Sequence, residues 1–214
     1  MAGLLLLGAG GHALVVAETA LASGLYSSIA FLDDRWSTLA PLPDQLGWPV
    51  IGPLAVSLDP HIRQQYPNAL VAIGNASLRL QWLTRLASVG FHLPVLSHPT
   101  AWVSPSAQLN AGSVVCAQAV IQSQTVIGRG VILNNCCSVD HDVLIGDGVH
   151  ICPGARLAGE VQVGDRSWIG IGSSVIQRIR IGSDVIVGAG AAVVRDLPDG
   201  VTAVGVPARE LPTS

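Results

Sequence analysis

The stretch VLIGDGVHICPGARLAGEVQVGDRSWIG, residues 143–170, decides the fold of this chain. An aliphatic residue returns in it at every sixth position, at Ile145, Ile151, Leu157, Val163 and Ile169. Two positions before each of these stands a small residue or a valine. A period of six fits neither an α-helix nor a plain alternating strand. It predicts a chain that turns a corner every six residues, so that three sides close a triangular coil of about 18 residues.

Outward from this stretch, the period of six runs over residues 101–193 without an insertion. The aliphatic positions are Val103, Leu109, Val115, Ile121, Ile127, Leu133, Val139, Ile145, Ile151, Leu157, Val163, Ile169, Val175, Ile181, Val187 and Val193. A chance alignment of ordinary short strands does not explain such a series. It predicts a prism of about five coils, each hydrogen-bonded to the next, with this column pointing inward.

Glycine recurs in register with the aliphatic column. It follows the aliphatic residue at Gly128, Gly146, Gly164, Gly170, Gly182 and Gly188. Glycine adopts positive φ without steric cost, so we expect these glycines to form the corners of the prism.

The composition of the 214-residue chain agrees with a stacked aliphatic core. Half of the residues are hydrophobic, 12% are charged and only 4% are aromatic. The net charge of -3 and the lack of a basic run argue against nucleic-acid binding. Cys116, Cys136, Cys137 and Cys152 form no CxxC pair, so we expect no metal site and free thiols in a reducing cytoplasm. We also expect no signal peptide and no transmembrane span.

Residues 1–95 lack the period of six and predict a separate domain. Apolar stretches at 3–7, 28–32 and 69–73 indicate strands, and helical patterns follow at about 13–22 and 76–89. Such alternation is typical of a small parallel sheet with Rossmann-like winding. The expected architecture is therefore a Rossmann-like α/β domain at 1–95 and a parallel β-helix at 96–214.

A glycine-rich turn, Gly8-Ala9-Gly10-Gly11-His12-Ala13, lies between the first strand and the first helix. Such a turn lets backbone N–H groups approach a pyrophosphate at a helix N-terminus. By itself it is compatible with NAD, FAD, a nucleotide-sugar or no ligand. His12 could contact a phosphate or sugar, or cap the helix. Asp33-Asp34 ends the second strand, where ribose or base hydroxyls are often read, although a solvated turn has the same pattern.

Taken together, the two halves resemble the PglD/NeuD family of bacterial sugar acetyltransferases over nearly the whole chain. These belong to the hexapeptide-repeat acyltransferases, whose β-helices are left-handed and associate as trimers. The matching stretches are Gly8-Ala9-Gly10-Gly11-His12-Ala13, Phe31-Leu32-Asp33-Asp34, Ala72-Ile73-Gly74-Asn75, Ser138-Val139-Asp140-His141-Asp142, Val149-His150-Ile151 and Gly205-Val206-Pro207-Ala208. The resemblance implies acetyl-CoA-dependent N-acetylation of an amino sugar linked to UDP or GDP, for surface glycans.

The resemblance also implies the residues of the site. The nucleotide-sugar contacts fall on Gly10, Gly11, His12, Asp33, Asp34 and Gly74. The catalytic base falls on His141, with the acidic Asp142 beside it. The acetyl-CoA contacts fall on His150, Ile171 and Ala189, and no metal is implied.

Coil geometry provides a separate test of these roles. Residues 18 apart stack, so Ala189 stacks on Ile171 and Trp168 on His150, forming a ridge that could hold a pantetheine arm. Trp168 therefore joins the expected acetyl-CoA contacts, although subunit packing would also explain it. His141 lies half a coil before His150 and should face another direction. We therefore expect a homotrimer in which one subunit provides the ridge and its neighbour provides His141.

The expected chemistry is direct attack of the acceptor on the thioester. A neutral imidazole takes the proton of the acceptor, and Asp142 holds the ring tautomer. The Gly159 N–H, one coil after His141, is a candidate oxyanion donor, and Cys136 and Cys137 are read as wall residues. Three alternatives stay open: O-acetylation of a sugar such as sialic acid, a non-catalytic nucleotide-binding scaffold, and an NAD-dependent oxidoreductase that would leave the β-helix unexplained.

Overall fold

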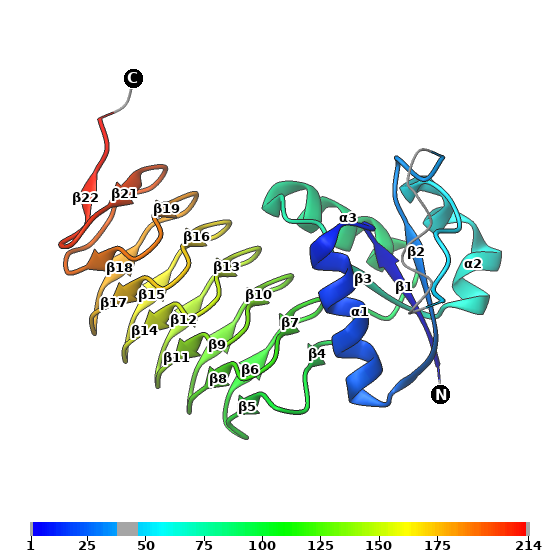
Figure 1. The fold of residues 1–214 in the computed structure, drawn as a ribbon, viewed down its shortest axis with the longest axis horizontal. Helices are drawn as coiled ribbons and strands as arrows, with labels where there is room; N and C mark the ends of the chain where they lie inside the picture. Colours follow the sequence, from blue (N-terminus) through cyan, green and yellow to red (C-terminus); the bar gives the residue numbers. More distant parts are fainter. Residues whose placement is uncertain (1, 38–46, 213–214) are drawn as a thin grey trace. The chain divides into compact units, whose positions relative to one another are not determined.

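The computed structural model describes residues 2–37 and 47–212 of the chain. The chain divides into two compact units, the first ending at Leu96 and the second beginning at Ser97. Figure 1 traces an α/β fold in the first unit and a regular coil in the second. The predicted fold class, an N-terminal α/β region followed by a hexapeptide β-helix, is confirmed.

The first unit is built on a parallel sheet of three strands in the order β2-β1-β3. Its elements are β1 (Ala2–Leu7), α1 (Gly11–Ser23), β2 (Tyr26–Leu32), the 3-10 helix η1 (Leu54–Leu58), α2 (Pro60–Gln65), β3 (Asn68–Val71) and α3 (Ala76–Ser88). Residues Leu4 to Leu7 of the central strand are all fully buried. A parallel strand covered on both faces has this continuous apolar pattern.

Helices α1 and α3 begin directly after strands β1 and β3. The first follows Gly10, which is extended, and ends at Gly24 in the left-handed conformation. The second is capped by Asn75, whose side chain accepts a hydrogen bond from the Leu78 N–H. Its buried residues, Arg79, Trp82, Leu83 and Leu86, follow the i, i+3, i+4, i+7 spacing of a helix face.

The second unit is a parallel β-solenoid with three faces (Figure 1). The first face contains β4 (Leu96–Ser97), β7 (Val114–Val115), β10 (Ile132–Leu133), β13 (His150–Ile151), β16 (Trp168–Ile169), β19 (Ile186–Val187), β21 (Thr202–Val204) and the antiparallel β22 (Arg209–Glu210). The second face contains β5 (Trp102–Val103), β8 (Val120–Ile121), β11 (Ser138–Val139), β14 (Arg156–Leu157), β17 (Ser174–Val175) and β20 (Ala192–Val193). The third face contains β6 (Gln108–Leu109), β9 (Val126–Ile127), β12 (Leu144–Ile145), β15 (Gln162–Val163) and β18 (Arg180–Ile181).

The predicted aliphatic column forms the interior of the solenoid. Register partners are 18 residues apart, as in Leu133 beside Ile151 and Ile151 beside Ile169. From Val115 to Val193 every member of the column is buried, and only Val103 and Leu109, in the first coil, are partly exposed. Each buried aliphatic side chain contributes about 1.5–3 kcal/mol relative to exposure, so the column is a main source of stability.

The corner glycines have a different role from the one we expected. Positive φ occurs at Gly130, Gly148, Gly172 and Gly190, each two residues after one of the glycines that we expected to have it. It also occurs at non-glycine residues such as Asp142 and Glu160. Gly128, Gly146, Gly164, Gly170, Gly182 and Gly188 do not have positive φ; a Cβ there would collide with atoms of the next coil. The expectation that these six glycines supply the left-handed conformation was therefore wrong. They are needed because successive coils approach too closely for a side chain.

This distinction predicts different effects for two glycine substitutions. A Cβ at Gly164 would lie 2.5 Å from the Ser183 nitrogen and 2.6 Å from the Gly182 carbonyl carbon, so Gly164→Ala must push two coils apart. We expect it to lower the free energy of unfolding by about 3 kcal/mol, as an overpacking change. Gly172 has positive φ but open space around it, so Gly172→Ala should cost only about 1 kcal/mol. Chemical denaturation measures both values, and an equal or larger loss in Gly172→Ala would contradict the close-approach explanation.

Candidate functional site

The first unit contains a cavity of about 530 Å³ at the carboxyl end of its sheet. The cavity is lined by Gly8, Gly10, Gly11, His12, Asp33, Asp34, Arg35, Leu54, Ala72, Ile73, Gly74 and Leu78. All six residues that the sequence predicted for the nucleotide-sugar therefore meet in one place. We call this cavity the glycine-turn pocket. Its position, outside the ends of parallel strands, is where α/β sheets usually bind ligands.

The glycine turn brings the start of α1 to this pocket. Gly8 has a φ of 105°, and a Cβ there would lie 2.8 Å from the Ala72 carbonyl oxygen, so the turn can pass β3 only as glycine. Gly10, at the N-cap, has no side chain to bond the first N–H groups, and the first turn of α1 contains no acidic residue. The free N–H groups and the helix dipole at such an end favour an anion.

Asp33 and Asp34 hold the walls of the pocket. The Ala9 N–H donates to Oδ2 of Asp33 (3.0 Å), and the Arg35 guanidinium donates to both carboxylate oxygens, each at 3.0 Å. The hydrogen bond from the Arg35 side chain lowers the pKa of Asp33 to about 2, so the pair is ionised at neutral pH. Asp34 accepts from the Leu54 N–H (2.9 Å) and fixes η1 to the strand end.

His141 lies on the solenoid, at the corner between the second and third faces. It follows β11 and precedes β12. Nδ1 lies 2.8 Å from Oδ2 of Asp142, and the backbone N–H of His141 donates to Oδ1 of Asp140 (2.8 Å). The hydrogen bond to Asp142 raises the pKa of His141 above its ordinary value. Because the carboxylate can only accept, Nδ1 carries the proton and Nε2 has the free lone pair that a general base needs.

The next coil supports the imidazole ring of His141. A Cβ at Gly159 would lie 2.6 Å from Nε2 and 2.7 Å from Cε1, so the ring occupies the space above this glycine. The Glu160 N–H donates to the His141 carbonyl (3.0 Å), which confirms that the two segments stack. The ring can take this position only because residue 159 is a glycine and has no side chain.

The predicted acetyl-CoA residues lie on another side of the prism. His150 is on the first face, 9% exposed, with the Asn134 amide donating to its Nε2 (3.1 Å). Trp168 is its register partner on the next coil, and the two ring centroids are 4.3 Å apart. Ile171 and Ala189 are exposed at the following corner, where the Gly190 N–H donates to the Ile171 carbonyl (2.8 Å).

The two groups of solenoid residues do not come together within one chain. His141 is at the corner between the second and third faces, and in a triangular prism this corner is opposite the first face, which carries His150 and Trp168. The interior between them is filled by the aliphatic column. A substrate could contact both groups only if a second copy of the chain provided one of them.

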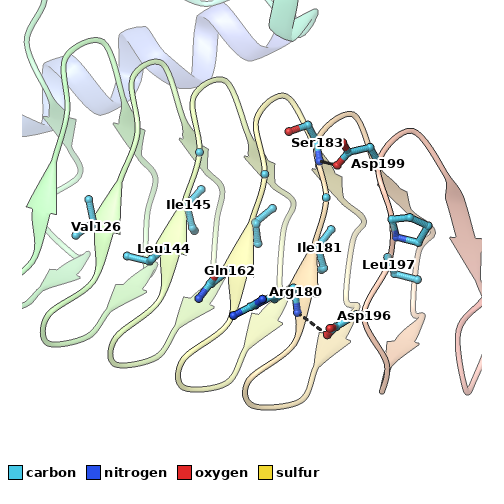
Figure 2. A pocket seen from close by; sticks show the side chains of 15 residues that line it. Val126, Leu144, Ile145, Gln162, Arg180, Ile181, Ser183, Asp196, Leu197 and Asp199 are labelled. Carbon is cyan, nitrogen blue, oxygen red and sulfur yellow. Dashed lines mark hydrogen bonds between the residues drawn. The ribbon is translucent and has the colours of Figure 1, made fainter.

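A groove of about 730 Å³ runs along the third face and contains none of the predicted site residues. Figure 2 shows Val126, Leu144, Gln162 and Arg180 in a row along it, with Asp196 accepting a hydrogen bond from the Arg180 N–H. Leu144 is exposed there, directly after the His141 corner. The lining of the groove includes the charged Arg180, Asp196 and Asp199, but not His141.

Three of the four thiols are poorly placed for nucleophilic chemistry, and the fourth, Cys136, is exposed, with its Sγ donating to Oε1 of Gln118 (3.3 Å). Cys116, Cys137 and Cys152 are buried, and burial raises the pKa of Cys116 to about 11 and that of Cys152 to about 12. A thiol with such a pKa is not a thiolate at neutral pH. In the described part of the chain no group of three or more His, Cys, Asp or Glu residues could hold a metal ion. No helix within residues 2–37 and 47–212 is both long enough and apolar enough to cross a bilayer.

Sequence reasoning missed three polar residues near the predicted sites: Arg35, Arg79 and Asn134. Arg35 holds Asp33 at the pocket, Asn134 holds His150, and Arg79 lies buried beneath the pocket. Only Arg79 had a signal in the sequence, because it occupies a buried position in the apolar stripe of α3. A charged residue in such a stripe usually has a specific partner.

The geometry around His141 predicts how its titration depends on its neighbours. Asp142→Asn removes the hydrogen-bonded carboxylate, the main cause of the raised pKa, and should lower the pKa of His141 towards its ordinary value. Asp140→Asn is the matched control, because Asp140 contributes only through its charge and should produce a smaller decrease. NMR titration of the imidazole measures both. Equal decreases in the two variants would contradict the assigned pair.

Comparison with known proteins agrees with the family that the sequence resembles. The family described as the PglD N-terminal domain matches residues 3–86. UDP-N-acetylbacillosamine N-acetyltransferase of Bacillus subtilis (strain 168) is 39% identical over 119 residues, which are 55% of this chain. The match spans about half of that curated relative, 52% of its length.

Solved structures match over the full chain. The acetyltransferase domain of PglB from Neisseria gonorrhoeae FA1090 is 46% identical with a TM-score of 0.92, covering 99% of this chain and 100% of that one. It has also been solved in complex with acetyl coenzyme A. A histidine-to-asparagine mutant of perosamine N-acetyltransferase from Caulobacter crescentus, in complex with CoA and GDP-perosamine, is 40% identical with a TM-score of 0.89, covering 100% of this chain and 98% of that one. The chain belongs to the PglD/NeuD family of hexapeptide-repeat sugar acetyltransferases.

Proposed function

We propose that this protein transfers the acetyl group of acetyl-CoA to the amine of a nucleotide-linked amino sugar. The observation that carries the proposal is that one chain contains both the His141–Asp142 pair and a pocket suited to a nucleoside diphosphate. Relatives named as N-acetyltransferases of UDP- and GDP-linked amino sugars support the same substrate class. The activated acceptor favours this reaction over acetylation of a free sugar such as sialic acid.

The proposed reaction is a direct acyl transfer. The amine nitrogen attacks the thioester carbonyl while Nε2 of His141 removes its proton, and the C–S bond then breaks as the CoA thiolate leaves. Asp142 stabilises the imidazolium that forms and keeps the ring oriented. The proton on His141 passes to the leaving thiolate, which returns the base to its starting form. Three of the four thiols are buried, and burial raises the pKa of Cys116 and Cys152, which supports a mechanism without an acyl-cysteine at these positions.

Histidine is well matched to this amine acceptor. A sugar amine that attacks as the neutral form still loses a proton during bond formation, and a base near neutral pKa can take it. Two related structures are histidine variants of perosamine N-acetyltransferase that hold both CoA and GDP-perosamine. Such complexes support a histidine that acts on bound substrates without being needed to bind them.

We propose further that the active enzyme is a homotrimer with sites between subunits. One subunit would provide the first-face ridge of His150 and Trp168 with Ile171 and Ala189, and the next would provide His141. The separation of these groups around the prism supports this arrangement, as do the exposed apolar side chains on both sides: Trp168, Ile171 and Ile186 on the ridge and Leu144 beside the base. Acetyl-CoA and nucleotide-sugars as substrates, together with four free cysteines, support a cytoplasmic location.

Replacing the base tests the mechanism. His141→Ala should lower kcat by about 10²- to 10⁴-fold and leave KM for acetyl-CoA nearly unchanged, because proton transfer is lost while binding is retained. The assay detects free CoA thiol with a panel of UDP- and GDP-linked amino sugars as acceptors. His92→Ala, which removes an exposed histidine of the first unit, is the control and should keep wild-type turnover. Wild-type kcat in His141→Ala, or turnover of free sugars alone, would contradict the proposal.

Mixed trimers test the shared site. His141→Ala chains with one affinity tag are co-expressed with Trp168→Ala chains carrying another, and trimers containing both are isolated by two purification steps. In each such ring one interface of three joins an intact ridge to an intact His141, so activity should recover to about a third of wild type. Each variant alone should stay far below this value. Mixed trimers no more active than the parents would contradict a site shared between subunits, as would an active monomer in sedimentation.

A further inference from the structure

Arg79 is the most deeply buried charged side chain in the described residues, and the mechanism so far gives it no role. It is 1% exposed and lies on the buried face of α3. Burial lowers its pKa only to about 10, so the guanidinium is charged at neutral pH. A buried cation is costly unless its surroundings compensate it. Its position therefore has to be explained by what surrounds it.

The contacts of Arg79 lead to the glycine-turn pocket. One guanidinium nitrogen, Nη1, donates to the carbonyl oxygens of Ile73 (2.7 Å) and Gly74 (3.0 Å). Both of these residues line the pocket, where the chain leaves β3 and enters α3. Carbonyl oxygens at the carboxyl end of a parallel strand are negative and would repel a bound phosphate. Arg79, which does not line the pocket, donates hydrogen bonds to two of these carbonyl oxygens.

The charge of Arg79 also reaches the other wall of the pocket. His12, in the first turn of α1, is close enough for Arg79 to lower its pKa, which burial and this charge together bring to about 4. His12 is therefore neutral at physiological pH. Asp33 is already ion-paired with Arg35 at the rim. Arg79 thus lies under both strand-to-helix turns that form the pocket.

We infer that Arg79 is a positioning residue for the diphosphate of the nucleotide-sugar: its buried guanidinium fixes the Ile73–Gly74 carbonyls and places a positive charge beneath the glycine turn. This inference rests on the proposed function, because it assigns the pocket to the diphosphate. The guanidinium acts through the turns and the field it creates, since Arg79 itself does not line the pocket. The inference predicts that the pocket binds a nucleoside diphosphate more tightly than the nucleoside, and that this preference depends on Arg79 although Arg79 contacts neither ligand.

Calorimetric titration of the full-length protein tests the inference, with UDP, GDP, uridine and guanosine as probes. Arg79→Met keeps the length and removes the charge. It should weaken binding of the preferred diphosphate by about 10- to 100-fold, as expected for the loss of a buried charge interaction, and leave nucleoside binding unchanged. In turnover, KM for the nucleotide-sugar should rise while KM for acetyl-CoA and kcat at saturation stay near wild type. A purely structural role would weaken all four probes alike.

Two further variants keep the test decisive. Arg85→Met removes an exposed arginine from the same helix, packed on Trp82, and should bind the diphosphate like wild type. Arg79→Lys retains the charge and should keep the preference for diphosphate over nucleoside to within a few-fold, even if Arg79→Met fails to fold. Loss of this preference in Arg79→Lys, or its retention in Arg79→Met, would overturn the inference. Wild-type protein that binds neither UDP nor GDP would instead contradict the proposed function and, with it, the subsite.

Discussion

The hydrogen bond from each coil to the next is the constraint on which the solenoid depends. The Ile132 N–H donates to the Val149 carbonyl and the His150 N–H to the Ser167 carbonyl, each at 3.0 Å, and the same step is repeated along all three faces. Because each bond joins neighbouring coils, a side chain is stacked on the residue 18 positions later through most of the solenoid, and on the residue 16 positions later in the last coil, as in Val187 beside Ala203. The spacing leaves no room for a Cβ at six corners, which explains the regular glycines.

This constraint also determines the geometry of the proposed catalytic residues. Stacking places the His141 ring on Gly159 and the His150 ring against Trp168, and it keeps the two histidines on opposite sides of a filled prism. A rigid scaffold of this kind holds the proposed base and the proposed coenzyme ridge in fixed directions. The proposed division of the site between two subunits follows from that rigidity, since no rearrangement of one chain could join the two groups.

The first unit uses charge instead of stacking to build its pocket. Asp33 ties the glycine turn to the second strand and is itself neutralised by Arg35, while Arg79 supports the third strand end from below. The result is a pocket at the N-terminus of α1, where no side chain caps the helix, and where the Asp33 carboxylate and the Ile73 and Gly74 carbonyl oxygens already accept hydrogen bonds. In the proposed function, the first unit recognises the nucleotide and the solenoid carries the chemistry on the sugar.

The sequence by itself determined the prism and the opposition of His141 and His150, because a strict period of six is a local pattern that every coil repeats. It determined the α/β unit through a different local pattern, the alternation of apolar stretches and helical segments. It also indicated the six residues that meet in the glycine-turn pocket, through motifs at the ends of predicted strands. Only the tertiary structure showed that the regular glycines are needed because neighbouring coils approach closely, and not because their φ is positive. The sequence could not separate the two explanations, since either requirement selects glycine. The tertiary structure also decided the roles of Asn134, Arg35 and Arg79, because these depend on the direction in which each side chain turns to reach its partner, and no sequence pattern gives that direction.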